Sequence, residues 1–215
     1  VSGRWRFGSG CRESDWMGGS CLVLDGDEPR RNMDGAPECR RFFARTEDCE
    51  IIDTWDVAGL RGTGSHDWCV TELFVPEELT QHYDALWDRW PGPLYSLPAQ
   101  ASRSGLHFSA VATGIARTAI DALVGLASSK VPMRVASLLR DQSWVQDAAG
   151  RAEALLGAGR AYRAAVTDDV WNTVVAGGKV SNEQLARCRL GAIVAVDNAM
   201  QAADLMYRAG GTTSI

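Results

Sequence analysis

Few side chains in this sequence have the type and spacing that catalysis requires. His66 directly precedes Asp67, and a histidine oriented by a carboxylate is a common general base. Because neighbouring residues of a strand point to opposite faces, this pair is not expected to form a dyad, and a structural role is favoured. Ser9 lies between Gly8 and Gly10, where the backbone can come close to a flat ligand because neither glycine carries a side chain.

Other candidate residues have simpler interpretations. The glycines at positions 59, 62 and 64 suggest a phosphate-binding loop, but a dinucleotide fingerprint needs a strand before them and a helix after them. Here a strand is expected to follow, so these glycines predict a tight turn between two strands. His107 is expected to be packed in, or to cap, a mostly buried helix, and His82 to be solvated. No Gly-x-Ser-x-Gly elbow joins a strand to a helix, as a serine hydrolase would require.

The cysteines do not predict a metal site. No two of them form a CxxC pair, and no histidine has metal-ligand spacing from any of them. Five fall in the first 70 residues, so a disulfide stays open on their number alone. Without a secretion signal, reduced and mostly buried thiols are expected. The six are Cys11, Cys21, Cys39, Cys49, Cys69 and Cys188.

The composition is that of an ordinary globular chain, with 46% hydrophobic and 23% charged residues. No run approaches the roughly 20 uncharged apolar residues of a membrane-spanning helix. No signal peptide is visible, so a cytoplasmic protein is expected. Residues 1–80 carry 9 Arg against 16 Asp and Glu, and residues 81–215 carry 13 Lys and Arg against 11 acids. Neither part has the basic patch that nucleic-acid binding requires, so neither nucleic acid nor a membrane is an expected partner.

The elements that must position these residues change in type along the chain. Over residues 1–80, short apolar runs alternate with Gly, Asp and Asn turns, which predicts a small antiparallel β-barrel or sandwich. Residues 68–75 should form a strand that Pro76 ends. Residues 81–100 are rich in proline and predict a connector.

Residues 101–215 predict a helical bundle. Apolar residues recur at intervals of three and four, and paired glycines end two of the helices. Ser181 and Gln184 have the spacing of a capping box that opens the third helix. Long helices joined by short loops should pack antiparallel, which gives an α+β fold. The expected helices are residues 106–129, 143–175 and 181–209.

Several of these segments resemble the acyl-CoA dehydrogenase superfamily of flavoproteins, in matching order over nearly the whole chain. Residues 55–78, WDVAGLRGTGSHDWCVTELFVPEE, are similar to the end of its middle β domain. Residues 1–16 are similar to the strand and turn against which the flavin ring rests. Residues 114–123, 139–146 and 207–211 resemble landmarks of its C-terminal helical domain. The resemblance implies a β-barrel-like middle domain followed by a helical bundle, with flavin as cofactor.

The turn Phe7-Gly8-Ser9-Gly10 and the Gly-Ser-His form at residues 64–66 look most like one branch. That branch comprises the oxygenase components of two-component flavin-dependent monooxygenases, of the p-hydroxyphenylacetate, secosteroid and dibenzothiophene hydroxylase type. They take reduced FMN or FAD from a separate flavin reductase and hydroxylate an aromatic or related small molecule with O₂. The resemblance also implies a homotetramer. Two alternatives stay open: an FAD-dependent acyl-CoA dehydrogenase and a non-catalytic interaction module.

The resemblance also supplies candidate cofactor-binding residues. Ser9 is the candidate for contact with the flavin N5 region, with its three neighbours in the turn around it. For the other candidates a solvated arginine or a helix cap is the plain alternative. Arg134 or Arg140 matches arginines of the family that reach the flavin phosphate. Gln146 matches a glutamine that helps tetramer packing. Gly210 and Gly211 match a loop that lies near the neighbouring subunit's cofactor.

No catalytic residue is assigned. Both ends of the chain look cut, and the N-terminal helical domain of the family is expected to be missing. The family's catalytic Glu or His lies in a segment that would follow Ile215. A chain that ends there is expected to be inactive alone.

Overall fold

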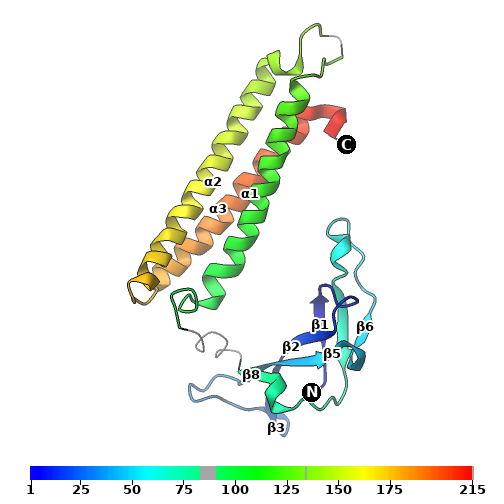
Figure 1. Cartoon of the computed structure of the whole chain (residues 1–215), viewed down its shortest axis with the longest axis vertical. Coiled ribbons are helices and arrows are strands. Elements are labelled where there is room, and N and C mark those ends of the chain that lie inside the picture. The colour runs from blue at the N-terminus through cyan, green and yellow to red at the C-terminus, as the bar shows by residue number, and fades with distance from the viewer. Residues whose placement is uncertain (83–90, 134, 215) are drawn as a thin grey trace. The chain divides into compact units, whose positions relative to one another are not determined.

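The computed structural model describes residues 1–82, 91–133 and 135–214. The chain divides into two compact units, Val1–Arg89 and Trp90–Ile215, and each has a hydrophobic core of its own. The first consists of strands and the second of helices (Figure 1). The predicted α+β class is confirmed. Of the connector expected over residues 81–100, positions 83–90 lie outside the described residues.

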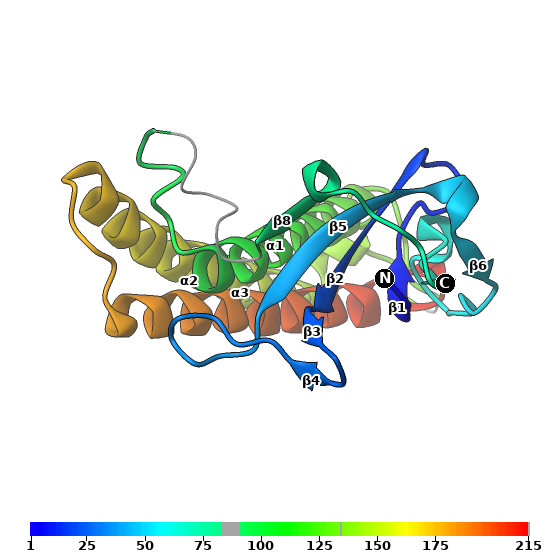
Figure 2. The same ribbon diagram turned by 90° about the horizontal axis from the view of Figure 1, so that it is seen from below.

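The first unit consists of short antiparallel strands. Their bounds are β1 Gly3–Gly8, β2 Trp16–Leu22, β3 Leu24–Asp25, β4 Glu28–Pro29, β5 Cys39–Arg45, β6 Glu50–Ile52, β7 His66–Val70 and β8 Thr80–His82. One sheet has the order β1-β7-β6 and another the order β2-β5-β8. The short strands β3 and β4 form a separate hairpin (Figure 2). The described strands do not close into a barrel, so the β-barrel-like expectation is corrected to two sheets that share a core.

Aromatic side chains from both sheets form that core. Trp68 of β7 and Phe42 of β5 are 2% and 1% exposed. Trp5 of β1 stacks on Trp68 at 4.7 Å between ring centroids and meets Phe42 edge-on at 5.1 Å. Its indole N–H donates to the Ser20 carbonyl at 2.8 Å, so the one polar group of this side chain is paired. A Cβ at Gly19 would lie 2.6 Å from the Phe42 ring, which explains the glycine there.

Two expectations about the β unit are wrong in detail. The strand expected over residues 68–75 ends at Val70, and Glu72 just beyond it takes a left-handed backbone conformation with φ 51°. The glycines at 59, 62 and 64 do not form a tight turn. They lie in a long loop between β6 and β7 that contains a short 3-10 helix, Arg61–Thr63.

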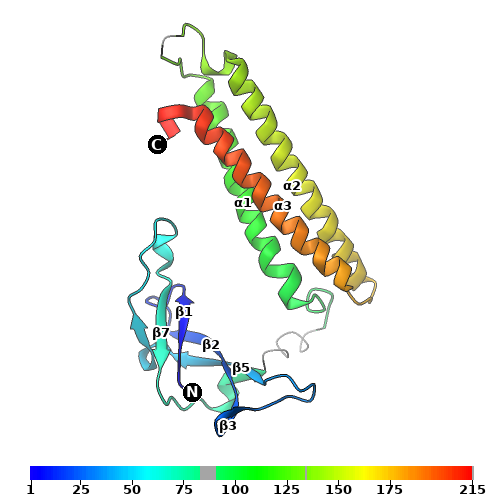
Figure 3. The same cartoon turned by 180° about the vertical axis from the view of Figure 1, so that it is seen from behind.

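The second unit is a bundle of three long helices, α1 Ala99–Ala127, α2 Ser143–Val175 and α3 Asn182–Gly210. Consecutive helices run antiparallel, and α3 packs against both α1 and α2 (Figure 3). The predicted bundle is confirmed, and α2 has the predicted bounds. The capping box is present, because Ser181 Oγ accepts from the Gln184 amide and Gln184 Oε1 accepts from the Ser181 amide. α1 begins earlier than the expected residue 106. The prediction missed its first turns because the polar residues there do not show the apolar period.

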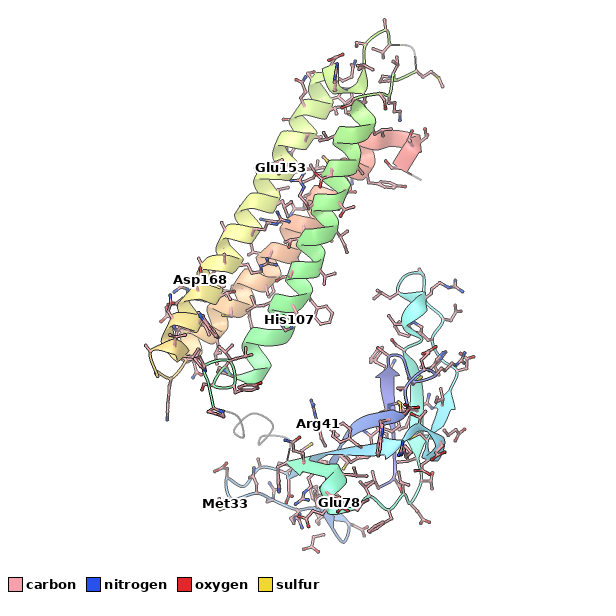
Figure 4. All side chains as sticks on the ribbon, viewed as in Figure 1. Met33, Arg41, Glu78, His107, Glu153 and Asp168 are labelled. Atoms are coloured by element: carbon pink, nitrogen blue, oxygen red, sulfur yellow. The ribbon has the colours of Figure 1, made fainter. Side chains whose placement is uncertain are left out.

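One stretch of α1, Gly105–Ala127, is long and apolar enough to cross a membrane by length and composition alone. The stretch contains Arg117 and Asp121, so it is not the run of about 20 uncharged apolar residues whose absence was expected. A helix of a packed bundle passes the same test, and this one carries charges. Arg117 pairs with Asp121 at 2.9 Å and with Glu153 of α2 at 2.7 Å. Glu153 is labelled on α2 in Figure 4.

His107 and the cysteines also differ from expectation. His107 is exposed on α1, well inside the helix, so it neither packs in the core nor caps (Figure 4). His82 is largely exposed, as expected, although it lies in β8. All six cysteines are free thiols, but Cys11 and Cys188 alone are buried.

Two glycines of the bundle allow a test of helix packing. A Cβ at Gly191 of α3 would lie 2.7 Å from Cγ2 of the buried Val166, whereas a Cβ at Gly157 of α2 would meet open space. Gly191→Ala is therefore expected to lower the free energy of unfolding by about 1–3 kcal/mol. Gly157→Ala should raise it by about 0.5–1 kcal/mol, because only the helix propensity changes. Urea denaturation measures both, and effects of the same sign would contradict the packing.

The β unit should lose stability in acid through one carboxylate. Arg30 donates to Glu38 at 2.7 and 2.9 Å and Arg40 at 3.1 Å, and these contacts lower the Glu38 pKa from 4.5 to about 2. The ionised form thus stabilises the fold above the unfolded pKa, and this contribution is lost as the pH falls towards about 2. Thermal unfolding of Glu38→Gln between about pH 5 and 2 should vary less with pH than wild type. Glu47→Gln should keep the wild-type slope.

Candidate functional site

The exposed ring of Phe7 departs from the regular pattern of strand β1. In a regular strand Phe7 would face the core together with Trp5, because side chains alternate. The register of β1 against β7 shifts between Trp5 and Gly8, and Phe7 takes a left-handed conformation with φ 62°. Its side chain is consequently 63% exposed. Such a conformation is costly for a bulky residue and marks positions where the fold holds a side chain for function.

Three hydroxyl groups connect this turn to the loop before β7. Ser9 Oγ lies 2.8 Å from Ser65 Oγ, which lies 2.7 Å from Thr63 Oγ1. Thr63 donates its one hydrogen to the Leu60 carbonyl at 2.9 Å. With Thr63 as the donor to that carbonyl, Ser65 donates to Thr63 and Ser9 donates to Ser65. The exposed Ser9 oxygen is therefore left as a hydrogen-bond acceptor for a ligand.

His66 holds the start of the same loop. Its Nδ1 accepts from the backbone amides of Thr54 and Trp55, each at 3.2 Å, so the neutral ring carries its proton on Nε2. Asp53 Oδ1 lies 3.1 Å from the same nitrogen and forms an ion pair only when the ring is protonated. His66 and Asp67 make separate contacts and form no dyad, as expected.

The contacts of this loop also fix the position of Trp55. Its amide is fixed by His66, its indole N–H donates to the Leu60 carbonyl at 3.0 Å, and its ring meets Phe7 edge-on at 6.2 Å. The two aromatic rings border an open cavity of about 750 Å³. Its lining residues are Arg4, Arg6, Phe7, Thr54, Trp55, Val57, Ser65 and Asp67.

The glycines of the turn serve different purposes. A Cβ at Gly8 would lie 2.9 Å from the Trp68 ring, so packing requires this glycine whatever the ligand. Gly10 has φ 71°, faces open space, and donates its amide to the Thr63 carbonyl at 2.8 Å. Gly10 therefore both ties the turn to the loop and leaves room beside Ser9.

The remaining described candidates lie in the helical unit and form two local groups. Gln146 donates to the Arg140 carbonyl at 3.0 Å, while the Arg140 guanidinium is largely exposed, 3.8 Å from Asp141. Gly211, with φ 62°, follows the end of α3. Arg134 lies outside the described residues.

Lys130 stabilises the end of α3. It donates to the Gly210 carbonyl at 2.7 Å and to Thr213 Oγ1 at 2.8 Å, where a positive charge favours a helix C-terminus. Sequence reasoning missed Lys130, and it also missed Thr63, Ser65 and Trp55. Trp55, Thr63 and Ser65 lie in the segment 55–78 that carries the resemblance, but nothing in that segment assigned them a role in the site. No group of three or more potential metal-ligating side chains occurs in the part of the chain that the structure describes.

A two-sheet β unit followed by an antiparallel bundle, with an exposed aromatic turn on the first sheet, defines a protein of the acyl-CoA dehydrogenase fold. Residues 106–215 match the protein family described as acyl-CoA dehydrogenase, C-terminal domain. The chain belongs to the acyl-CoA dehydrogenase family.

Relatives of known activity align with the whole chain. An indole-3-acetate monooxygenase of Pseudomonas putida is 30% identical over 221 residues, which cover 100% of this chain and 53% of that protein. A flavin-dependent monooxygenase oxygenase subunit, HsaA of Rhodococcus jostii, is 28% identical over 100% of this chain and 56% of its own length. The crystal structure of 3-HSA hydroxylase from Rhodococcus sp. RHA1 superposes with a TM-score of 0.81 at 27% identity, over 99% of this chain and 55% of that one. The chain spans about half the length of the curated relatives it matches.

The role of His66 as an acceptor can be tested by substitution. His66→Phe leaves two backbone amides without their acceptor and should lower the free energy of unfolding by about 1–3 kcal/mol. His66→Asn, whose amide oxygen can replace Nδ1, should lose clearly less. Urea denaturation followed by tryptophan fluorescence gives both values. Equal losses for the two variants would mean that the acceptor contributes little.

Proposed function

We propose that this chain is part of the oxygenase component of a two-component flavin-dependent monooxygenase. The protein would hydroxylate an aromatic small molecule with reduced FMN or FAD and O₂, and a separate flavin reductase would supply the reduced flavin. The observation that carries the proposal is the similarity along the whole chain to proteins named as monooxygenases and oxygenase subunits.

The turn at Phe7 to Gly10 fits a flat flavin ring. Phe7 presents an exposed aromatic surface, and the space beside Gly10 is open. Ser9 offers an acceptor, which suits the N5–H group that reduced flavin carries and oxidised flavin lacks. When bound, the flavin supplies the reaction with O₂, and the protein orients it and limits water around it. Phe7 and Trp55 are the apolar surfaces that would do this beside Ser9.

A homotetramer in the cytoplasm is the second part of the proposal. Both α1 and α3 carry large apolar side chains that the described residues leave exposed, which is the kind of surface that further protein covers. They include Phe108, Val111, Ile115, Ile193 and Met200. Reduced flavin from a reductase partner would be available in the same compartment.

The test of the proposed function uses the intact protein. With reduced flavin, O₂ and indole-3-acetate as the probe substrate, we expect O₂ consumption and a hydroxylated product, with no reaction when oxidised flavin alone is given. Tightly bound FAD that an acyl-CoA bleaches would instead indicate a dehydrogenase. Failure to bind either form of flavin would favour a non-catalytic interaction module.

The hydroxyl chain predicts how one substitution changes flavin preference. In Ser65→Ala, Ser9 loses the oxygen that accepts its hydrogen, so Ser9 can donate as well as accept. The preference for reduced over oxidised flavin should fall by on the order of tenfold, about the value of one hydrogen bond. Anaerobic equilibrium titration with both forms of the flavin measures this ratio. Ser2→Ala, which lies outside the turn, should leave the ratio unchanged. An unchanged ratio in Ser65→Ala would show that the chain of hydroxyl groups does not set the role of Ser9.

A further inference from the structure

The cavity beside Phe7 has a row of cationic side chains along β1. Arg4 and Arg6 are two residues apart and therefore share one face of the strand. The register shift before Gly8 brings the Phe7 ring to the same cavity. One wall of the cavity is thus aromatic and another is cationic.

The two arginines differ in how far their charge is neutralised. Arg4 donates to Asp67 Oδ2 from two nitrogens, at 2.7 and 3.0 Å, and this contact lowers the pKa of Asp67. Within the described parts of the chain, no carboxylate is in ion-pair contact with Arg6. Its guanidinium lies 5.2 Å from the centre of the Phe7 ring. A ring holds a cation in place without neutralising its charge. The Arg6 charge also helps to lower the pKa of Asp67, but that carboxylate is ion-paired with Arg4. Among the described residues the Arg6 guanidinium therefore has no ion pair of its own and can bind an anion.

We propose that this cavity binds an aromatic molecule that carries an anionic group, with the anion at Arg6 and the ring system against Phe7 and Trp55. A guanidinium matches the geometry of a carboxylate or a phosphate with two parallel N–H donors. Ser65 lines the same cavity and contacts Ser9, so the ligand reaches the turn at which the proposed function places the flavin. The anion is therefore either the flavin phosphate or the carboxylate of an aromatic substrate. These two identities rest on the proposed function, whereas the binding of an aromatic anion does not.

Pairs of ligands that differ in the anion distinguish the two sources. FMN and riboflavin differ by the phosphate, and indole-3-acetate and indole-3-ethanol differ by the carboxylate. Dissociation constants are measured in the intact protein, without turnover, by fluorescence titration for the flavins and by calorimetry for the indoles. Wild type should prefer the anionic member of at least one pair by on the order of tenfold.

Arg6→Gln should abolish that preference while leaving the affinity for the neutral member nearly unchanged. Arg6 is exposed, so the variant should fold, which its thermal unfolding checks. Arg6→Lys keeps the charge without the paired donors and should retain part of the preference. Arg31→Gln removes an exposed arginine of the same unit that does not line the cavity, and should behave as wild type.

Each outcome decides the proposal. Loss of the FMN preference identifies the flavin phosphate as the anion, and loss of the indole-3-acetate preference identifies the substrate carboxylate. A preference that survives in Arg6→Gln, or wild type that prefers the anion in neither pair, overturns the proposal. Because no turnover is measured, either negative result leaves the O₂-dependent hydroxylation to be judged by its own assay.

Discussion

The register shift in β1 is the constraint on which the rest of the site depends. Trp5 has to face the core, where it stacks on Trp68 and closes the space above Gly19. A regular strand would send Phe7 to the same side, and its ring would not be exposed at the surface. The shift and the left-handed conformation at Phe7 separate the two aromatic residues, one in the core and one at the surface. Arg4 and Arg6 remain on the opposite face of β1 from Trp5, as strand alternation requires.

The loop between β6 and β7 holds this turn in place from the other side. Its own backbone hydrogen bonds are confined to local turns, such as that from the Thr63 amide to the Leu60 carbonyl at 3.1 Å, and side chains satisfy further polar groups. His66 accepts two of its amides, and Gly10 and Ser9 bind its end at Thr63 and Ser65. Since His66 and Ser65 are nearly buried, the loop is fixed from within the protein. A loop held in this way can present Trp55 to a ligand without being ordered by it.

How much of this the sequence could predict depends on how local the determinants are. The bounds of α2 and the capping box at Ser181 follow from periodicity and spacing within one helix, and both were predicted. The position of Phe7 depends on cross-strand register, and the contact of Arg4 with Asp67 joins residues 63 apart. Neither is visible in a local pattern. The burial of His107 was predicted wrongly. An apolar period shows which face of a helix packs inward, but it does not show how much of the remaining helix surface other elements cover.

Two kinds of recognition meet at this turn, and they have separate origins. Ser9 acts as an acceptor when Thr63 donates to the Leu60 carbonyl and Ser65 donates to Thr63, so this property depends on the loop. The charge at Arg6 is set by β1 and by the fact that Asp67 binds Arg4 instead. The first distinguishes ligands by whether they donate a hydrogen bond, the second by whether they carry a negative charge. Because separate groups supply them, a substitution at Arg6 should change the preference for an anion without changing the hydrogen bonds of Ser9. In the proposed function, the turn therefore selects reduced over oxidised flavin. The exposed face of β1 selects ligands by their charge.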